Sequence, residues 1–140
     1  MAAPTAESLI EANAAFYRAF EALDMAAMEA VWEASDRLFC VHPGWQALHG
    51  REAVLGSWRT ILTHTAQIGF DLTAVRAEVW GGLGVVTLYE NLQSTVGEEQ
   101  HAATAISTNL FAFHGDQGGW KLFHHHASLA QAAEPPGVVN

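Results

Sequence analysis

The chain has 140 residues, of which half are hydrophobic and 15% are charged, so it supports one domain with a buried core and excludes a disordered chain. Six Lys and Arg residues against fifteen Asp and Glu residues give a net charge of −9 with neutral histidine. Because binding to a phosphate backbone needs clustered positive charge, the sequence predicts no nucleic-acid partner.

The ends of the chain and its single cysteine bear on location. The first residues, MAAPTAESLIE, lack the positive flank and apolar run of a signal peptide, and no stretch reaches the about 18 apolar residues of a membrane span. Cys40 has no partner for an internal disulfide, which fits a reducing compartment, and we expect it to be a buried apolar filler. We therefore expect a cytoplasmic protein without a membrane partner, with one domain over residues 1–130 and a flexible tail over 131–140.

Helical spacing begins near the N-terminus. The apolar residues that share one helix face are Leu9, Phe16, Phe20 and Leu23. This first helix begins either at a capping box formed by Ser8 and Glu11 or near Thr5.

Two further helices and a short strand are predicted before residue 65. Asp24 can cap the second helix, and residues 37–42 (RLFCVH) form an apolar strand that Pro43 ends. After Gly50, helical spacing returns in the set Val54, Leu55, Trp58, Ile61 and Leu62.

Four runs rich in strand-forming residues follow, at about 68–80, 84–96, 99–114 and 119–128. Their short glycine-containing connections indicate an antiparallel meander. The order of elements predicts an α+β domain in which helices cover one face of a curved sheet.

Three consecutive histidines lie in the last predicted strand. Alternation along a strand places His124 and His126 on the face shared by Trp120 and Leu122, and places His125 on the opposite face. We therefore expect His124 and His126 to line the interior and His125 to face away. With His42 this pair could bind a metal, but the absence of an HExxH or cysteine-rich spacing favours polar lining, and no metal or cofactor is predicted.

Two residues are candidates for chemistry. His42 ends the first strand, where an imidazole with an ordinary pKa near ~6.5 can act as a general base at neutral pH. Asn109 interrupts an apolar stretch, ISTNLFAF, and its amide could donate a hydrogen bond to a developing oxyanion. The alternative for His42 is an ordinary packing or turn residue.

Four further residues are candidates for lining a pocket. Tyr89 and Asn91 share a strand face and can supply polar lining. Trp45 and Trp58 supply large flat apolar surfaces that either shape a ligand pocket or fill the core.

Several stretches together resemble the nuclear transport factor 2-like superfamily, most closely SnoaL-like domains and the association domain of calcium/calmodulin-dependent protein kinase II. They are FYRAFEALDMAAMEAVW, FCVHPGW followed by LHGREAV, and TNLFAFHGDQGGWKLFHHHAS. The resemblance extends over about residues 5–130.

The resemblance implies a cone-shaped α+β barrel in which a strongly curved antiparallel sheet wraps three helices, leaves a pocket at its wide end, and forms a homodimer through its outer face. In ketosteroid isomerases of this superfamily, the catalytic Asp base stands at the position of His42, an acid stands at that of Asn109, and a tyrosine stands at that of Phe16. Tyr17 lies about 100° further round the helix and is not expected to replace that hydroxyl.

Two functions follow from this resemblance and from the residues. The first is a SnoaL-like domain that binds a small apolar organic molecule and acts as an isomerase or lyase with His42 as the base. The alternative is a noncatalytic module for ligand binding or oligomeric assembly. The base placed opposite an amide donor favours the enzyme.

Overall fold

The computed structural model describes residues 3–116 and 118–130, so the tail expected at 131–140 lies outside the described residues. The helices are α1 (Ala6–Glu21), α2 (Met25–Val31) and α3 (Arg51–His64). The strands are β1 (Phe39–Val41), β2 (Leu48–His49), β3 (Gln67–Trp80), β4 (Leu83–Val96), β5 (Glu99–His114) and β6 (Gly119–Leu129). Within the described ranges, no helix is long and apolar enough to cross a membrane.

The six strands form one curved sheet in the order β2-β1-β6-β5-β4-β3. The predicted meander is confirmed, because β3 to β6 pair consecutively and antiparallel. The expected α+β fold, with three helices packed against a strongly curved sheet, is confirmed. The sheet is mixed and unclosed, because β1 pairs with β6 in parallel and β2 and β3 lie at its two edges. A parallel partner from the first half of the chain makes the sheet mixed, and local sequence carries no signal for such a distant pairing.

Local capping explains where the helices begin. Thr5 caps α1 and forms a reciprocal capping box with Ser8, which selects the earlier of the two predicted starts. Asp24 accepts a hydrogen bond from the backbone N–H of Ala27 and caps α2 as predicted. Gly50 precedes α3 with φ of 90°, a left-handed backbone conformation that glycine adopts without strain.

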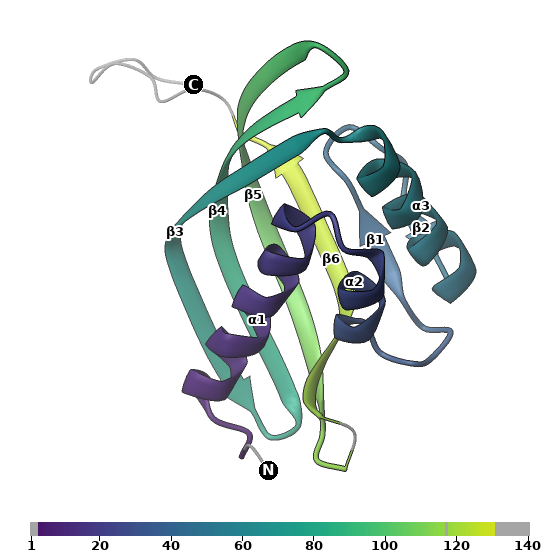
Figure 1. Ribbon diagram of the computed structural model, residues 1–140. Helices are drawn as coiled ribbons and strands as arrows, with labels where there is room; N and C mark the ends of the chain where they lie inside the picture. The colour runs from purple at the N-terminus through teal and green to yellow at the C-terminus, as the bar shows by residue number, and fades with distance from the viewer. Residues whose placement is uncertain (1–2, 117, 131–140) are drawn as a thin grey trace.

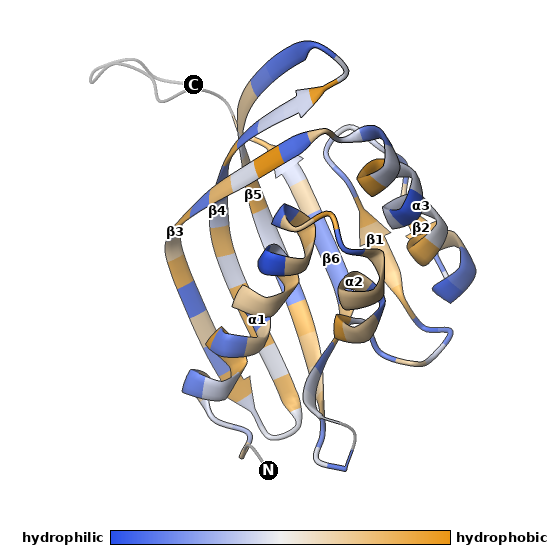
Figure 2. Ribbon diagram, in the orientation of Figure 1, coloured by the Kyte–Doolittle hydropathy of each residue, from blue (hydrophilic) through white to orange (hydrophobic). Residues whose placement is uncertain are grey.

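Helix α1 lies across the concave face of the sheet, and α3 lies beside β1 and β2 (Figure 1). Figure 2 shows hydrophobic and hydrophilic bands alternating along β3 and β4, as expected for strands with one buried face. The largest fully buried side chains include Trp32, Trp58, Phe16, Phe111 and Leu9. Helix α1 approaches β4 so closely that a Cβ atom on Gly84 would lie 2.6 Å from a methyl carbon of Leu9.

A β-bulge in β6 controls the direction of the histidines. Leu110 and Phe111 are adjacent in β5, yet they pair with His124 and Leu122, so Phe123 is an extra residue in β6. One extra residue reverses the alternation of all the side chains beyond it. His125 therefore lies on the same buried face as Leu122, and the face predicted for the three histidines was wrong.

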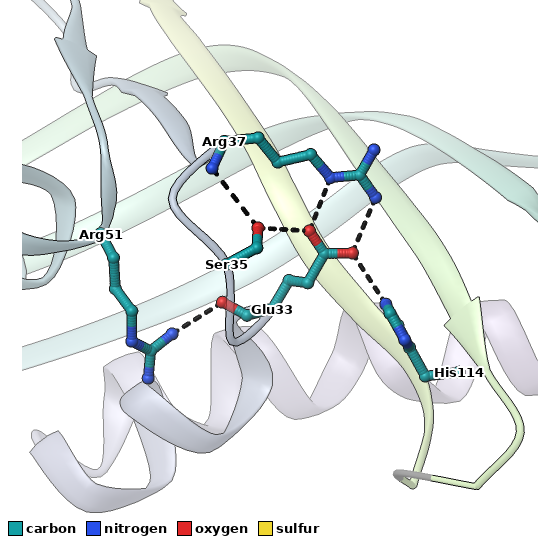
Figure 3. Close-up of polar contacts among 5 residues, drawn as sticks. All are labelled: Glu33, Ser35, Arg37, Arg51 and His114. Carbon is teal, nitrogen blue, oxygen red and sulfur yellow. Dashed lines mark hydrogen bonds and ion pairs between the residues drawn. The ribbon is translucent and has the colours of Figure 1, made fainter.

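A buried carboxylate ties the segment after α2 to the end of β5 (Figure 3). Glu33 accepts hydrogen bonds from Nε and Nη2 of Arg37, at 2.6 and 2.7 Å, and its two oxygens also contact Ser35 Oγ and His114 Nε2. Arg51 at the start of α3 donates to the Glu33 carbonyl oxygen at 2.6 Å. We call these five residues the Glu33 clamp. The clamp holds the segment between α2 and β1 against the start of α3 and the end of β5.

Candidate active site

His42 lies directly after β1 and is 4% exposed. Its Nε2 is 2.9 Å from Ser57 Oγ on α3, while the Ser57 hydroxyl itself donates to the Val54 carbonyl oxygen at 2.7 Å. Since that hydroxyl proton is already used, His42 Nε2 must carry the proton that lies between His42 and Ser57. The lone pair of neutral His42 is therefore on Nδ1, and burial lowers the pKa of His42 from 6.5 to about 4.

A second buried imidazole, His125, lies across the interior from His42. The centroids of the two rings are 6.5 Å apart, and His125 is 3% exposed. Parallel pairing places Cys40 of β1 opposite His125 of β6, and His42 lies two residues beyond Cys40, directly after the end of β1. Burial first, and then the neighbouring His42, lowers the pKa of His125 to about 3, so both imidazoles are neutral at pH 7.

Asn109 fixes the tautomer of His125. The Nδ1 of His125 lies 2.5 Å from Asn109 Oδ1, and an amide oxygen only accepts, so His125 Nδ1 carries the proton and Nε2 holds the lone pair. Asn109 Nδ2 donates to Asn13 Oδ1 at 2.9 Å and to the Tyr17 hydroxyl at 3.2 Å. Both amide hydrogens are thus used within the protein, and neither is available to an oxyanion in this arrangement.

The polar network continues from Asn109 to a buried carboxyl group. The hydroxyls of Tyr17 and Ser107 both donate to Glu90 Oε2, at 2.5 and 2.6 Å, and Glu90 is 4% exposed. Burial raises the pKa of Glu90, and burial together with this carboxyl raises that of Tyr17. Tyr17 thus reaches the interior from α1, with Phe16 buried beside it. Its hydroxyl is bonded to Glu90 and Asn109, the latter of which orients His125.

Aromatic rings enclose the two imidazoles. Trp58 lies edge-on to His42 with centroids 4.8 Å apart and is 6.1 Å from His125. Trp58 is fully buried, and its indole Nε1 has no hydrogen-bond partner among the described residues. Trp45, in the loop after β1, packs edge-on to His42 at 4.8 Å but is 45% exposed. The structure therefore brings both predicted tryptophans to His42.

The other two histidines lie outside this cluster. His124 stacks on Phe39 with ring centroids 4.5 Å apart, and His126 is exposed. The prediction that His124 and His126 line the interior was wrong, because the bulge at Phe123 turns them to the opposite face. They therefore do not converge with His42. Within the described part of the chain, no three His, Cys, Asp or Glu side chains are placed to hold a metal ion.

Tyr89 and Asn91 also lie away from the imidazoles. Tyr89 is 42% exposed, and its neighbour Glu90 occupies the inner face of β4 instead. Both predicted residues do line a hollow of about 1050 Å³, together with Phe70 and other residues of β3, β4 and β5. This hollow contains neither imidazole, so they do not supply the polar lining of the histidine site.

Sequence reasoning missed His125, Glu90, Ser107, Asn13 and Ser57 as site residues. The alternation of side chains along β4 could have identified Glu90, because it lies two and four residues after the buried Leu88 and Val86. Ser107 and Asn109 likewise have the same parity on β5. No comparable signal existed for His125, whose direction depends on the bulge.

Known proteins share this architecture. The sequence model of the SnoaL-like domain matches residues 9–132. A Streptomyces avermitilis protein of the NTF2-like family, to which dehydratase activity is ascribed, is 37% identical, with a TM-score of 0.83 over 91% of this chain and 96% of that protein. A Thiobacillus denitrificans protein described as a calcium/calmodulin-dependent protein kinase type II association domain is 33% identical, with a TM-score of 0.76 over 91% and 97%.

A curated relative extends beyond the matched region. The F-box protein SKIP8 of Arabidopsis thaliana is 26% identical over 136 residues, which amount to 97% of this chain and 55% of that protein. The chain thus spans about half the length of this relative.

Proposed function

This chain belongs to the SnoaL-like domain family of NTF2-like proteins, and we propose that it is an isomerase- or lyase-type enzyme that transfers a proton on a small organic molecule. The observation that carries the proposal is the pair of buried neutral imidazoles, His42 and His125, each with one nitrogen fixed as a donor to the protein. Both imidazoles are unprotonated at pH 7 and can accept a proton, and the lowered pKa of His42 makes it a weaker base than a free imidazole. Asn109 is a positioning residue that orients His125.

The proposed step begins when His42 Nδ1 removes a proton from a carbon next to a carbonyl group. The C–H electron pair moves into the enolate, and His42 becomes an imidazolium. In an isomerisation the proton returns to another carbon. In a lyase reaction the C–O bond to a neighbouring hydroxyl group breaks, and the imidazolium proton leaves with that oxygen as water. Each version restores neutral His42 without an external acid or oxidant.

Dehydration is the first reaction to test, since the Streptomyces protein with ascribed dehydratase activity is 37% identical over most of both chains. A thermal-shift screen of small hydroxy-ketones would select ligands, and turnover of the hits would follow. The proposal predicts that His42→Ala still binds a hit but loses at least ~10²-fold in rate. Turnover at the wild-type rate in His42→Ala would overturn it.

A noncatalytic assembly module is the second candidate. Its support is the 33% identity to the protein described as an association domain. Hits that bind without being transformed by the wild-type protein would favour this function.

We further propose that either function operates in a homodimer formed through the outer face of the sheet. Tyr89 and Ile106 are directly paired on that face and are 42% and 43% exposed. Paired exposed apolar side chains favour a second protein surface as their cover. Sedimentation at micromolar concentration tests this, and a 15 kDa species alone would contradict it.

A further inference from the structure

We propose that the histidine site binds uncharged carbonyl compounds and rejects carboxylates and phosphates, with the indole N–H of Trp58 donating to the carbonyl oxygen. This inference rests on the proposed function, whose site it shares, and it names the ligand class of that site. Two independent features carry it: the charges of the interior and an unsatisfied donor.

The first feature is the placement of positive charge. The chain's Lys and Arg residues number six: Arg18, Arg37, Arg51, Arg59, Arg76 and Lys121. All six are within the described ranges, and none of them is buried. Arg37 and Arg51 are moreover engaged by the Glu33 clamp. The interior around His42 therefore contains no guanidinium or ammonium group that could pair with an anion.

The ionisable groups that are buried there do not replace this missing charge. Burial holds His42 and His125 in the neutral form at pH 7. Glu90 is connected to His125 through Tyr17 and Asn109, and its carboxyl group is either negative or neutral, never positive. An anionic ligand would lose its hydration without gaining a partner of opposite charge, which is strongly unfavourable in a buried site.

The second feature is the indole of Trp58. An indole N–H only donates, and a buried donor without a partner costs free energy that an entering acceptor can recover. Among the described residues no acceptor reaches Trp58 Nε1, and the ring lies edge-on to His42. An oxygen bound to this N–H would hold its carbon skeleton beside the base.

Trp32 provides a contrast within the same protein. Its Nε1 is also buried without a partner among the described residues. Its ring packs against Phe16, whereas Trp58 packs against Phe16 and both imidazoles. Only at Trp58 does an unsatisfied donor coincide with a base. An uncharged carbonyl oxygen satisfies this donor and activates the adjacent C–H bond that the proposed reaction requires.

Two matched pairs of probes test this inference at pH 7: acetophenone against benzoate, and cyclohexyl methyl ketone against cyclohexanecarboxylate. The members of each pair have closely similar shapes and differ chiefly in charge. Each is titrated into the full chain while the indole ¹H–¹⁵N resonances are followed by NMR. The Trp58 resonance is the one missing in Trp58→Phe, and the signals of Trp32 and exposed Trp80 serve as internal controls.

We expect both ketones to shift the Trp58 resonance saturably while the Trp32 and Trp80 resonances stay in place. Each carboxylate should bind at least ~10-fold more weakly than its ketone. Trp58→Phe should weaken ketone binding by about 3- to 10-fold. If this variant does not fold, the affinities of the wild-type protein for each ketone and its matched carboxylate decide the question alone.

Carboxylates that bind as tightly as ketones would overturn the inference, as would ketones that bind without moving the Trp58 resonance or do not bind at all. Turnover is not needed for any of these results. If a ketone binds at Trp58 and no hydroxy-ketone is transformed, the proposed enzyme function fails while the inferred ligand class stands.

Discussion

Asn109 Oδ1 lies 2.5 Å from His125 Nδ1, and this contact determines which nitrogen of the buried imidazole holds its lone pair. Replacing Asn109 by Asp would place an acceptor-only carboxylate at the same distance. Because a nearby negative charge favours imidazolium, the pKa of His125 should rise from about 3 by one unit or more.

An NMR titration of the His125 ring signals measures this change. Asn91→Asp is the matched control, since Asn91 bonds to Thr104 and to β3 rather than to a histidine. An unchanged His125 titration in Asn109→Asp would show that the contact does not control the imidazole.

The pKa of His42 predicts a pH dependence of stability. The unfolded chain binds a proton to this residue near pH 6.5, whereas the folded chain binds it only near pH 4. Unfolded protein therefore holds more protons between these values, and the free energy of unfolding falls as pH falls from 6.5 to 4.

Comparison with His42→Gln isolates this contribution. Between pH 6.5 and 4 the wild type should lose up to about 1.4 kcal/mol per pH unit relative to the variant. The raised pKa of Glu90 acts in the opposite direction, lowering stability as pH rises above 4.5, but it is common to both proteins and cancels in the difference. Parallel stability profiles from urea unfolding would contradict a buried neutral His42.

The Glu33 clamp predicts a second pH-dependent contribution to stability, which depends on the carboxyl group of Glu33. Hydrogen bonds from Arg37 lower the pKa of Glu33 to about 2, so its contribution is complete above pH 4.5 and is lost as pH falls toward 2. Glu33→Ala should lower the free energy of unfolding by about 1–3 kcal/mol at pH 7. The half-exposed Arg37 limits the effect, since water can solvate it again.

The double variant with Arg37→Ala should be less destabilised than the sum of the two single changes. Glu99→Ala, which removes an exposed contact to His101, should change stability by less than about 0.5 kcal/mol. Additive effects of the two clamp changes in urea unfolding would show that Glu33 and Arg37 act independently.

The proposed homodimer predicts that a charge introduced on the outer face of the sheet dissociates the dimer. Ile106→Lys places a charge beside Tyr89 and should shift the protein to a monomer in sedimentation, because a desolvated unpaired charge opposes association. Val96→Lys, at an exposed position near the end of β4, is the control and should leave the oligomeric state unchanged. If Ile106→Lys remains a dimer like Val96→Lys, this face is not the dimer interface.

The helices and long strands could be predicted because their residues repeat with the period of the element. The expected run at 84–96 differs from β4 by one residue, and Asp24 caps α2 as expected. His42 was identified because it ends an apolar strand, and Trp58 because its large flat side chain lies on the apolar face of a predicted helix. These are properties that a short stretch of sequence carries by itself.

The candidate site was harder to predict because it depends on pairing between distant segments. The bulge residue Phe123 packs beneath the guanidinium of Arg37, 4.3 Å from its ring centroid, and neither glycine nor proline marks the irregularity. The parallel contact of β1 with β6 brings His42 toward His125 across more than half of the chain. Neither relationship leaves a local pattern, so the wrong histidines were assigned to the interior.

The role of His42 as a general base is tested most directly by hydrogen exchange at carbon. Wild type and His42→Ala would be incubated with cyclohexyl methyl ketone in D₂O at pH 7, and deuterium incorporation next to the carbonyl group would be followed by NMR. We predict exchange catalysed by the wild type and at least ~10²-fold slower in His42→Ala. Equal exchange rates in the two proteins, or no exchange above the rate without protein, would contradict this role.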